Sequence, residues 1–181
     1  RYKEGDSLRQ MFDAENRDEV IFITDRCQMY RAKVSDFENS KASVLGDFLP
    51  AKLGMDADEK AVFMNIQNEL KEGENFVYIF ENGKGVRVPQ KAYETTSVRR
   101  KLKSVCSDAS PLVEVFAENE KKPFEIMLVS SNNRAIIIKT SLIPQKATKT
   151  SAGVQLMTVK AGVKIERALS DFESVYEITK G

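Results

Sequence analysis

Clusters of lysine and arginine are the residues of this sequence whose type and spacing most clearly suggest chemistry. The net charge is only +1, because 28 basic side chains face 27 acidic ones. The basic residues are unevenly placed, however: residues 84–103 hold seven of them against Glu94 alone, and residues 134–149 hold four with no acid. Such runs create positive surface that a neutral total conceals. Closely spaced phosphates are a fitting ligand, because each neutralised phosphate releases condensed counterions.

The candidate phosphate contacts form three groups along the chain. The main group lies in residues 91–103 and a second in 139–149, whereas a weaker third group has the acidic neighbours Asp36 and Glu38. Scattered cations of this kind bind a phosphate backbone without recognising the base sequence. Any single lysine is equally well interpreted as a solvated surface charge. We predict contacts to duplex DNA from Lys91, Arg99, Arg100, Lys101, Lys103, Lys139, Lys146, Lys149, Arg31 and Lys33, with Lys41 as a weaker candidate.

Other chemistry has little support in the sequence. The absence of histidine removes the usual general base and the commonest metal ligand, and no Walker-type loop is present for ATP. Cys27 and Cys106 lie far apart without metal-ligand spacing, so we expect two free thiols in a reducing cytoplasm. No apolar run approaches the length of a membrane span. There is no tryptophan, and the aromatic residues do not interleave with the basic cluster, which disfavours stacking on single-stranded bases.

The elements that must position these cations come from an internal repeat. Three 18-residue windows align without a gap, and each reads as an apolar run, a polar turn and a second apolar-rich run. They are VIFITDRCQMYRAKVSDF (20–37), FVYIFENGKGVRVPQKAY (76–93) and IMLVSSNNRAIIIKTSLI (126–143). Asn82-Gly83 is the strongest hairpin turn of the three. The matched residues Phe22, Tyr78 and Leu128 are predicted to be core, and Gly83, Gly85 and Gly153 to serve turns or close packing.

Two further short apolar segments follow each hairpin, which makes about four strands per unit, as in a propeller-like blade. The segments are 47–53 and 61–66 after the first hairpin, 102–106 and 111–116 after the second, and 153–159 and 163–169 after the third. The pattern predicts an all-β single domain over residues 1–181 with low helix content, and the best helical candidate is 56–64, for which an insertion loop is the alternative. We expect blade-like units at about 19–70, 75–119 and 124–170, with residues 1–18 supplying a strand of a preceding or shared unit and 171–181 a C-terminal strand.

Sequence motifs in units two and three resemble a known family. The sequences GVRVP (85–89), AYET (92–95), RRKLK (99–103) and SDASPLV (107–113) are followed by TSLIP (140–144) and TSAGVQLM (150–157). They are similar to blades of the C-terminal domain of the A subunit of bacterial type IIA topoisomerases, DNA gyrase and topoisomerase IV. The resemblance spans nearly the whole chain and is strongest over residues 75–169.

The resemblance implies a β-pinwheel, which is a propeller-like fold whose neighbouring blades exchange hairpins and whose basic rim binds double-stranded DNA. With about three repeats, the wheel would be incomplete or open. The expected partners are duplex DNA, the rest of the A subunit and the ATPase B subunit, in the cytoplasm and nucleoid of a bacterium. The family's cleavage tyrosine lies in another region, so no catalytic role passes to any tyrosine here. ATP and Mg²⁺ would be used elsewhere in the holoenzyme, and this fragment needs no cofactor.

One departure from the family pattern concerns the type of enzyme. Gyrase A subunits carry the box Gln-Arg-Arg-Gly-Gly-Lys-Gly in a loop of the first blade, whereas the matching linker here, residues 38–46, has Lys41 as its one basic residue. This favours a topoisomerase IV-like subunit that guides DNA over a gyrase that wraps it. Two alternatives stay open: a propeller-like scaffold for protein partners, served by the acidic residues 56–72, and an independent enzyme.

Overall fold

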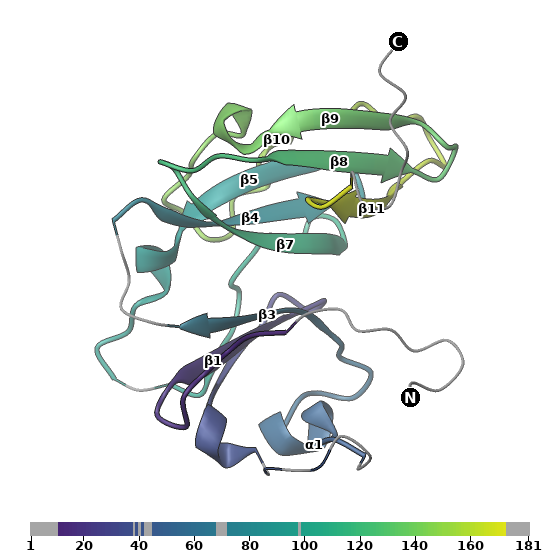
Figure 1. Cartoon of the computed structure of the whole chain (residues 1–181). Coiled ribbons are helices and arrows are strands. Elements are labelled where there is room, and N and C mark those ends of the chain that lie inside the picture. Colours follow the sequence, from purple (N-terminus) through teal and green to yellow (C-terminus); the bar gives the residue numbers. More distant parts are fainter. Residues whose placement is uncertain are drawn as a thin grey trace.

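Short antiparallel strands make up most of the computed structural model, which describes residues 11–37, 39, 41, 45–67, 72–97 and 99–172 (Figure 1). Three successive units each contain a hairpin, a one-turn 3-10 helix (η), a linker and a further strand. Unit one comprises β1 (Glu19–Thr24), β2 (Met29–Lys33), η1 (Val34–Asp36), α1 (Leu49–Leu53) and β3 (Ala61–Gln67). Unit two comprises β4 (Glu74–Phe80), β5 (Lys84–Pro89), η2 (Gln90–Tyr93), β6 (Lys101–Leu102) and β7 (Leu112–Asn119). Unit three comprises β8 (Glu125–Ser130), β9 (Ala135–Lys139), η3 (Thr140–Leu142), β10 (Val154–Gln155) and β11 (Ile165–Leu169).

The three hairpins have matching geometry, as the aligned windows predict. Each turn places one residue at positive φ, and that residue occupies the same repeat position in all three: Cys27 (φ 53°), Gly83 (φ 80°) and Asn133 (φ 61°). Glycine and asparagine tolerate this conformation readily. Cysteine does so less well, so the first turn owes its shape to the pairing of its strands, in which Phe22 faces Tyr30 and Ile23 faces Met29.

Strand exchange links consecutive units, and this confirms the expectation of a pinwheel. The sheets have the orders β3-β1-β2-β6, β10-β5-β4-β7 and β11-β8-β9. Thus β6 of unit two forms the outer strand of the unit-one sheet, and β10 of unit three does the same for unit two; we call β6 and β10 the exchange strands. The approach of the second one is close, because a Cβ on Gly153 would lie 2.2 Å from the carbonyl oxygen of Gly85.

Strand β4 lies at the centre of the core and is buried along nearly its whole length. Its alternate side chains point to opposite faces. Phe76 and Tyr78 pack with Ile21 and Phe63 of unit one, whereas Val77 and Ile79 pack with apolar residues of unit three. This explains the continuously apolar sequence of the strand. The predicted core residues Phe22, Tyr78 and Leu128 are all buried.

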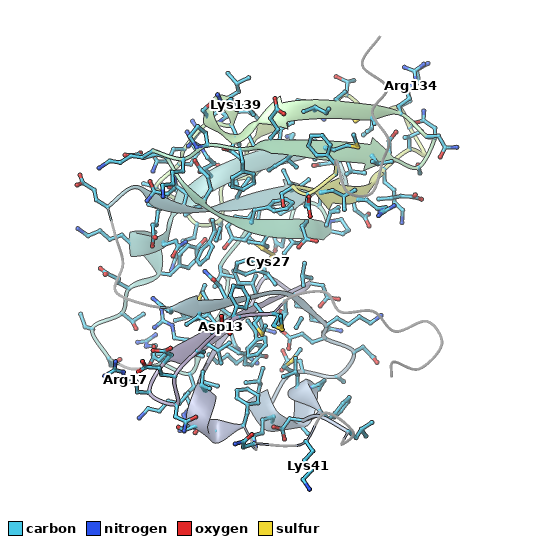
Figure 2. All side chains as sticks on the ribbon, in the orientation of Figure 1. Asp13, Arg17, Cys27, Lys41, Arg134 and Lys139 are labelled. Atoms are coloured by element: carbon cyan, nitrogen blue, oxygen red, sulfur yellow. A yellow bond between two sulfur atoms is a disulfide. The ribbon has the colours of Figure 1, made fainter. Side chains whose placement is uncertain are left out.

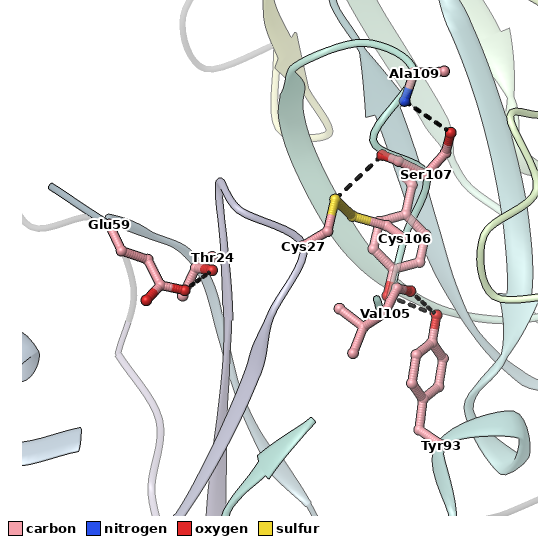
Figure 3. The surroundings of a disulfide bond; sticks show 9 residues. Thr24, Cys27, Glu59, Tyr93, Val105, Cys106, Ser107 and Ala109 are labelled. Atoms are coloured by element: carbon pink, nitrogen blue, oxygen red, sulfur yellow. Dashed lines mark hydrogen bonds between the residues drawn. A yellow bond between two sulfur atoms is a disulfide. The ribbon is translucent and has the colours of Figure 1, made fainter. Parts of the chain in front are cut away.

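A disulfide joins Cys27 to Cys106, so the prediction of two free thiols is wrong (Figure 3). The cause is the strand exchange. Pairing of β6 with β2 carries the segment after β6 to the turn of the first hairpin, where the amide of Val105 donates a hydrogen bond to the carbonyl oxygen of Cys27 at 3.0 Å. The two Cα atoms are then 5.1 Å apart, within the range of a disulfide. The bond fastens the segment that follows β6 to unit one.

The linker of unit one differs from the sequence prediction. Residues 47–53 were expected to include a strand, but Leu49–Leu53 forms α1, which begins with a proline in its first turn and ends at Gly54 with φ 63°. Such a start and end are typical of a short helix. The helical candidate 56–64 is also wrong, because Ala61–Gln67 is strand β3. The strands expected at the two ends of the chain lie mostly outside the described residues, and Met11, Phe12, Asp171 and Phe172 are in no strand.

Candidate nucleic-acid interface

The segment from η2 to Lys103, just after β6, carries the main cluster of predicted DNA contacts; we call it the unit-two linker. Because β6 pairs with β2, this linker runs from the sheet of unit two to the outer edge of the sheet of unit one. The amide of Arg31 on β2 donates a hydrogen bond to the carbonyl oxygen of Arg100 at 2.8 Å, which fixes the linker beside β2. The side chains of Lys91, Arg99, Arg100 and Lys103 are exposed. Four of the five predicted residues in this cluster are therefore available to a ligand.

Lys101, the fifth, has contacts inside unit one. Its Nζ lies 3.1 Å from Oδ1 of Asp56 and 5.2 Å from the centre of the Tyr30 ring. Hydrogen bonding to Tyr30 and Asp56 raises the pKa of Lys101, and hydrogen bonds from Gln28 and Lys101 lower the pKa of Asp56. Lys101 is therefore positively charged and shares that charge with a carboxylate, so it is the weakest phosphate candidate of the cluster.

A pocket of about 300 Å³ lies where this linker meets β2 and α1. Its charged lining residues are Arg31, Lys52, Arg100 and Lys101, with Asp36 as the one acid. The guanidinium of Arg31 donates from Nη2 to the carbonyl oxygen of Tyr93 at 2.7 Å. Its Nε is buried and has no hydrogen-bond partner in the described part of the chain. Lys52 and Lys101 are ion-paired with Asp47 and Asp56, so Arg31 and Arg100 are the cations that make this pocket suited to a phosphate group.

Lys52 is a lining residue that the sequence prediction missed. It lies on α1, within the segment that was expected to form a strand, and it makes an ion pair with Asp47 at 3.7 Å. Its Nζ also lies 5.9 Å from the centre of the Phe37 ring. A proline followed four residues later by glycine at 50–54 was the available signal for this helix.

The predicted lysines of unit three do not form one cluster. Lys149 reaches unit two, where its Nζ lies 5.7 Å from the centre of the Tyr93 ring in η2, the helix that also carries Lys91. Lys146 is exposed, and its amide donates to the carbonyl oxygen of Arg87 at 2.8 Å. Lys139 is exposed at the end of β9, opposite Arg134 at the other end (Figure 2). The structure thus brings Lys149 to unit two and leaves Lys139 apart.

The remaining predicted contacts, Lys33 and Lys41, belong to unit one. Both are exposed, and the amide of Lys33 donates to Oδ2 of Asp36 at 3.0 Å. Lys41 lies at the far end of the molecule from Lys139 and Arg134 (Figure 2). The predicted cations are therefore spread over the three units, and the pocket beside β2 is where they converge most closely.

Two acids of the stretch considered for a protein partner make contacts within unit one, whereas Asp58 and Glu72 are exposed. Glu59 is buried and accepts hydrogen bonds from Thr24 Oγ1 at 2.5 Å and Tyr30 OH at 2.7 Å. Asp56 accepts from Gln28 at 2.7 Å as well as from Lys101. Residues 68–71 lie outside the described part of the chain. These two carboxylates help to hold the first hairpin in place, and of the two Glu59 is buried whereas Asp56 is exposed.

Metal and membrane signals are absent from the described residues. No group of three or more cysteine, aspartate or glutamate side chains lies where it could hold a metal ion in this part of the chain. No helix among these residues is long and apolar enough to cross a membrane.

The family model of the DNA gyrase C-terminal domain, a beta-propeller, matches residues 18–43 and 125–170. The predicted resemblance is confirmed. The two matched segments are the first hairpin with the beginning of its linker, and the whole of unit three from β8 to β11. Unit two, whose motifs pointed most strongly to the family, lies outside the match. No sequence among the curated proteins matches the chain.

Solved structures share the fold at low sequence identity. The C-terminal domain of DNA topoisomerase IV gives a TM-score of 0.72 at 20% identity, over 84% of this chain and 47% of that one. The DNA gyrase A C-terminal domain gives 0.59 at 13%, over 88% and 50%. The E. coli ParC C-terminal domain gives 0.64 at 13%, over 93% and 68%. The chain thus spans about half the length of the first two domains, and its fold is theirs.

Proposed function

We propose that this chain is the non-catalytic DNA-binding part of a type IIA topoisomerase A subunit. It holds the phosphate backbone of duplex DNA in the pocket beside β2 and along the exposed cations of the unit-two linker. The observation that carries this proposal is the pocket itself, where Arg31 and Arg100 lie beside Lys52 and Lys101, two lysines that share their charge with Asp47 and Asp56. The matched family and the shared fold support it, because the domains concerned come from DNA gyrase and topoisomerase IV.

The mode of binding follows from the chemistry of the cations. Exposed lysines and arginines on linkers contact phosphates without reading bases, so we expect the affinity for DNA to depend on salt concentration and little on base sequence.

The linker of unit one has Lys41 as its one basic residue, where a gyrase A subunit has its basic box. We therefore propose a topoisomerase IV-like guide that bends or orients DNA during ATP-dependent strand passage. It would work in the bacterial cytoplasm with the rest of the A subunit and the ATPase B subunit, which would use the ATP and Mg²⁺.

Fluorescence anisotropy with a labelled duplex, measured across a salt series, tests the proposal. The logarithm of affinity should fall linearly with the logarithm of salt, with a slope of about −0.9 for each phosphate neutralised. The variant Arg99→Ala/Arg100→Ala/Lys103→Ala should reduce the slope by about 2 to 3 and weaken binding to every duplex alike. All three side chains are exposed, so the fold should be unchanged.

The control is Lys121→Ala/Lys122→Ala, which removes two exposed charges from the turn between β7 and β8, whose residues do not line the pocket. Its affinity should stay within about twofold of the parent chain. Equal losses in the two variants would leave only a general effect of net charge, and the assigned site would be wrong. Absence of duplex binding at low salt would refute DNA binding itself.

A further inference from the structure

The loop before the last strand has the same backbone turn in units one and three. In unit one, the amide of Glu59 donates a hydrogen bond to the carbonyl oxygen of Asp56 at 3.3 Å. In unit three, the amide of Val163 donates to the carbonyl oxygen of Lys160 at 3.0 Å. Both turns lie just before the strand that pairs with the first strand of the hairpin. Val163 therefore occupies the position of Glu59, and Lys160 occupies that of Asp56.

Carboxylates of this loop fill the space beside the hairpin turn in unit one. Glu59 is buried and accepts hydrogen bonds from Thr24 Oγ1 and from Gln28 Nε2, the second at 3.0 Å. Asp56 accepts from the same Nε2 at 2.7 Å. In the aligned repeat windows, the residue that corresponds to Gln28 is Arg134. A side chain that donates to carboxylates in unit one is thus replaced by a cation in unit three.

Unit three has no carboxylate at this place, and a pocket of about 220 Å³ lies there, which we call the unit-three pocket. Its charged lining residues are Arg134 and Lys160, and no acid among the described residues lines it. Neither of these two side chains has a hydrogen-bond or ion-pair partner in the described part of the chain. Met157, Val159 and Val163 supply the apolar part of the lining. The place that holds a carboxylate in unit one is therefore open and positively charged in unit three.

We propose that the unit-three pocket binds a glutamate side chain from an acidic segment of a protein partner. Arg134 can donate two parallel N–H bonds to a carboxylate, and Lys160 adds a second positive charge. The apolar lining residues suit the methylene stem of a glutamate, which a phosphate group lacks. Glu59 shows that the same turn of this fold holds a glutamate carboxylate when the chain supplies one. The partner would supply it in unit three.

Fluorescence anisotropy with a labelled oligoglutamate peptide tests the proposal, with an oligoglutamine peptide of the same length for comparison. The parent chain should bind the glutamate peptide at least about tenfold more tightly than the glutamine peptide. Arg134→Gln/Lys160→Gln should weaken binding of the glutamate peptide by at least about tenfold, because hydrogen bonds to a charged group are lost. Both side chains are exposed, so the fold should be unchanged. The matched control, Lys121→Gln/Lys122→Gln, removes two exposed charges that do not line the pocket and should stay within about twofold.

A second variant gives unit three the carboxylate that unit one already has. Val163→Glu places a glutamate at the position of Glu59, so it should occupy the pocket and weaken binding of the peptide by at least about tenfold. Ala147→Glu adds the same charge to an exposed residue of unit three that does not line the pocket. Its affinity for the peptide should stay within about twofold of the parent chain.

Duplex DNA in the same assay separates this site from the proposed DNA-binding site, since Arg134→Gln/Lys160→Gln should leave the affinity for DNA within about twofold. A variant that loses DNA binding and keeps peptide binding would overturn the proposal, because the occupant would then be a phosphate backbone. Equal losses in this variant and in the lysine control would also overturn it, because net charge would explain both. Absence of binding of the glutamate peptide at low salt would refute it directly.

Discussion

The junction between units one and two and the junction between units two and three use the same backbone exchange with different side chains. In each, an arginine on the second strand bonds a carbonyl oxygen of the following unit: Arg31 donates to Tyr93 at 2.7 Å, and Arg87 donates from Nε to Ile143 at 2.7 Å. At the second junction, Glu118 forms an ion pair with Arg87 at 3.2 Å. The matching residue of unit one is Gln67, whose Oε1 is buried without a partner among the described residues.

Because of this difference, Arg87 has a structural role, whereas the charge of Arg31 is not neutralised by a matching carboxylate. Glu118 is fully buried, and its carboxylate neutralises Arg87 inside the junction. Arg31 has no carboxylate in that place, so its charge contributes to the pocket that we propose for phosphate. The first junction is strengthened instead by the Cys27–Cys106 disulfide, which adds no charge. The same strand exchange is thus stabilised by an ion pair at one junction and by a disulfide at the other. The junction with the disulfide leaves the arginine charge available to a ligand.

Removal of the carboxylate at the second junction should have the largest effect on stability. Glu118→Ala leaves Arg87, itself only 13% exposed, without its ion-pair partner. Breaking a buried pair in this way costs about 3–5 kcal/mol. Urea denaturation should show a lower midpoint with an unchanged slope. Gln67→Ala is the matched control at the equivalent position, where no ion pair exists, and it should cost clearly less. Equal losses would mean that the ion pair does not distinguish the junctions.

Loss of the disulfide should have the next largest effect, and only at the first junction. Cys27→Ser/Cys106→Ser frees the linker after β6 from the first hairpin, and removal of a disulfide typically costs about 2–4 kcal/mol. The parent chain should lose the same stability when it is reduced, whereas the variant should not respond to reductant. A parent chain whose urea midpoint is the same with and without reductant would contradict this assignment.

The parts of this fold that depend on residues close in sequence were predictable from the sequence. The parts that depend on the exchange of strands between units were less predictable. The hairpins follow from alternation of apolar runs with turns such as Asn82-Gly83, which act within a few residues. The disulfide was missed because Cys27 and Cys106, 79 residues apart, meet only through the pairing of β6 with β2. Lys52 was missed with the helix that carries it. Arg31 was predicted as a weak DNA contact, but its lack of a carboxylate partner appears only when Gln67 is matched to Glu118.

A carboxylate placed at the first junction, at the position that matches Glu118 of the second, should have the smallest effect on stability. Its effect on DNA binding should be the most specific. Gln67→Glu places a carboxylate where the matching Glu118 pairs with its arginine, so it should pair with Arg31. The gain in stability should be about 1 kcal/mol or less, because the new charge must also be desolvated. Neutralising Arg31 should weaken duplex binding and reduce the salt slope by about 1.

The control must add the same charge without breaking a contact. Gln28→Glu, in unit one beside Asp56, is unsuitable because it disturbs the hydrogen bonds of Gln28 with Asp56 and Glu59. Ala161→Glu, in the exposed turn that precedes β11, adds the same charge and is suitable. If both variants weaken binding equally, net charge alone explains the loss; if Gln67→Glu acts alone, the uncompensated charge of Arg31 is what makes the first junction the binding one.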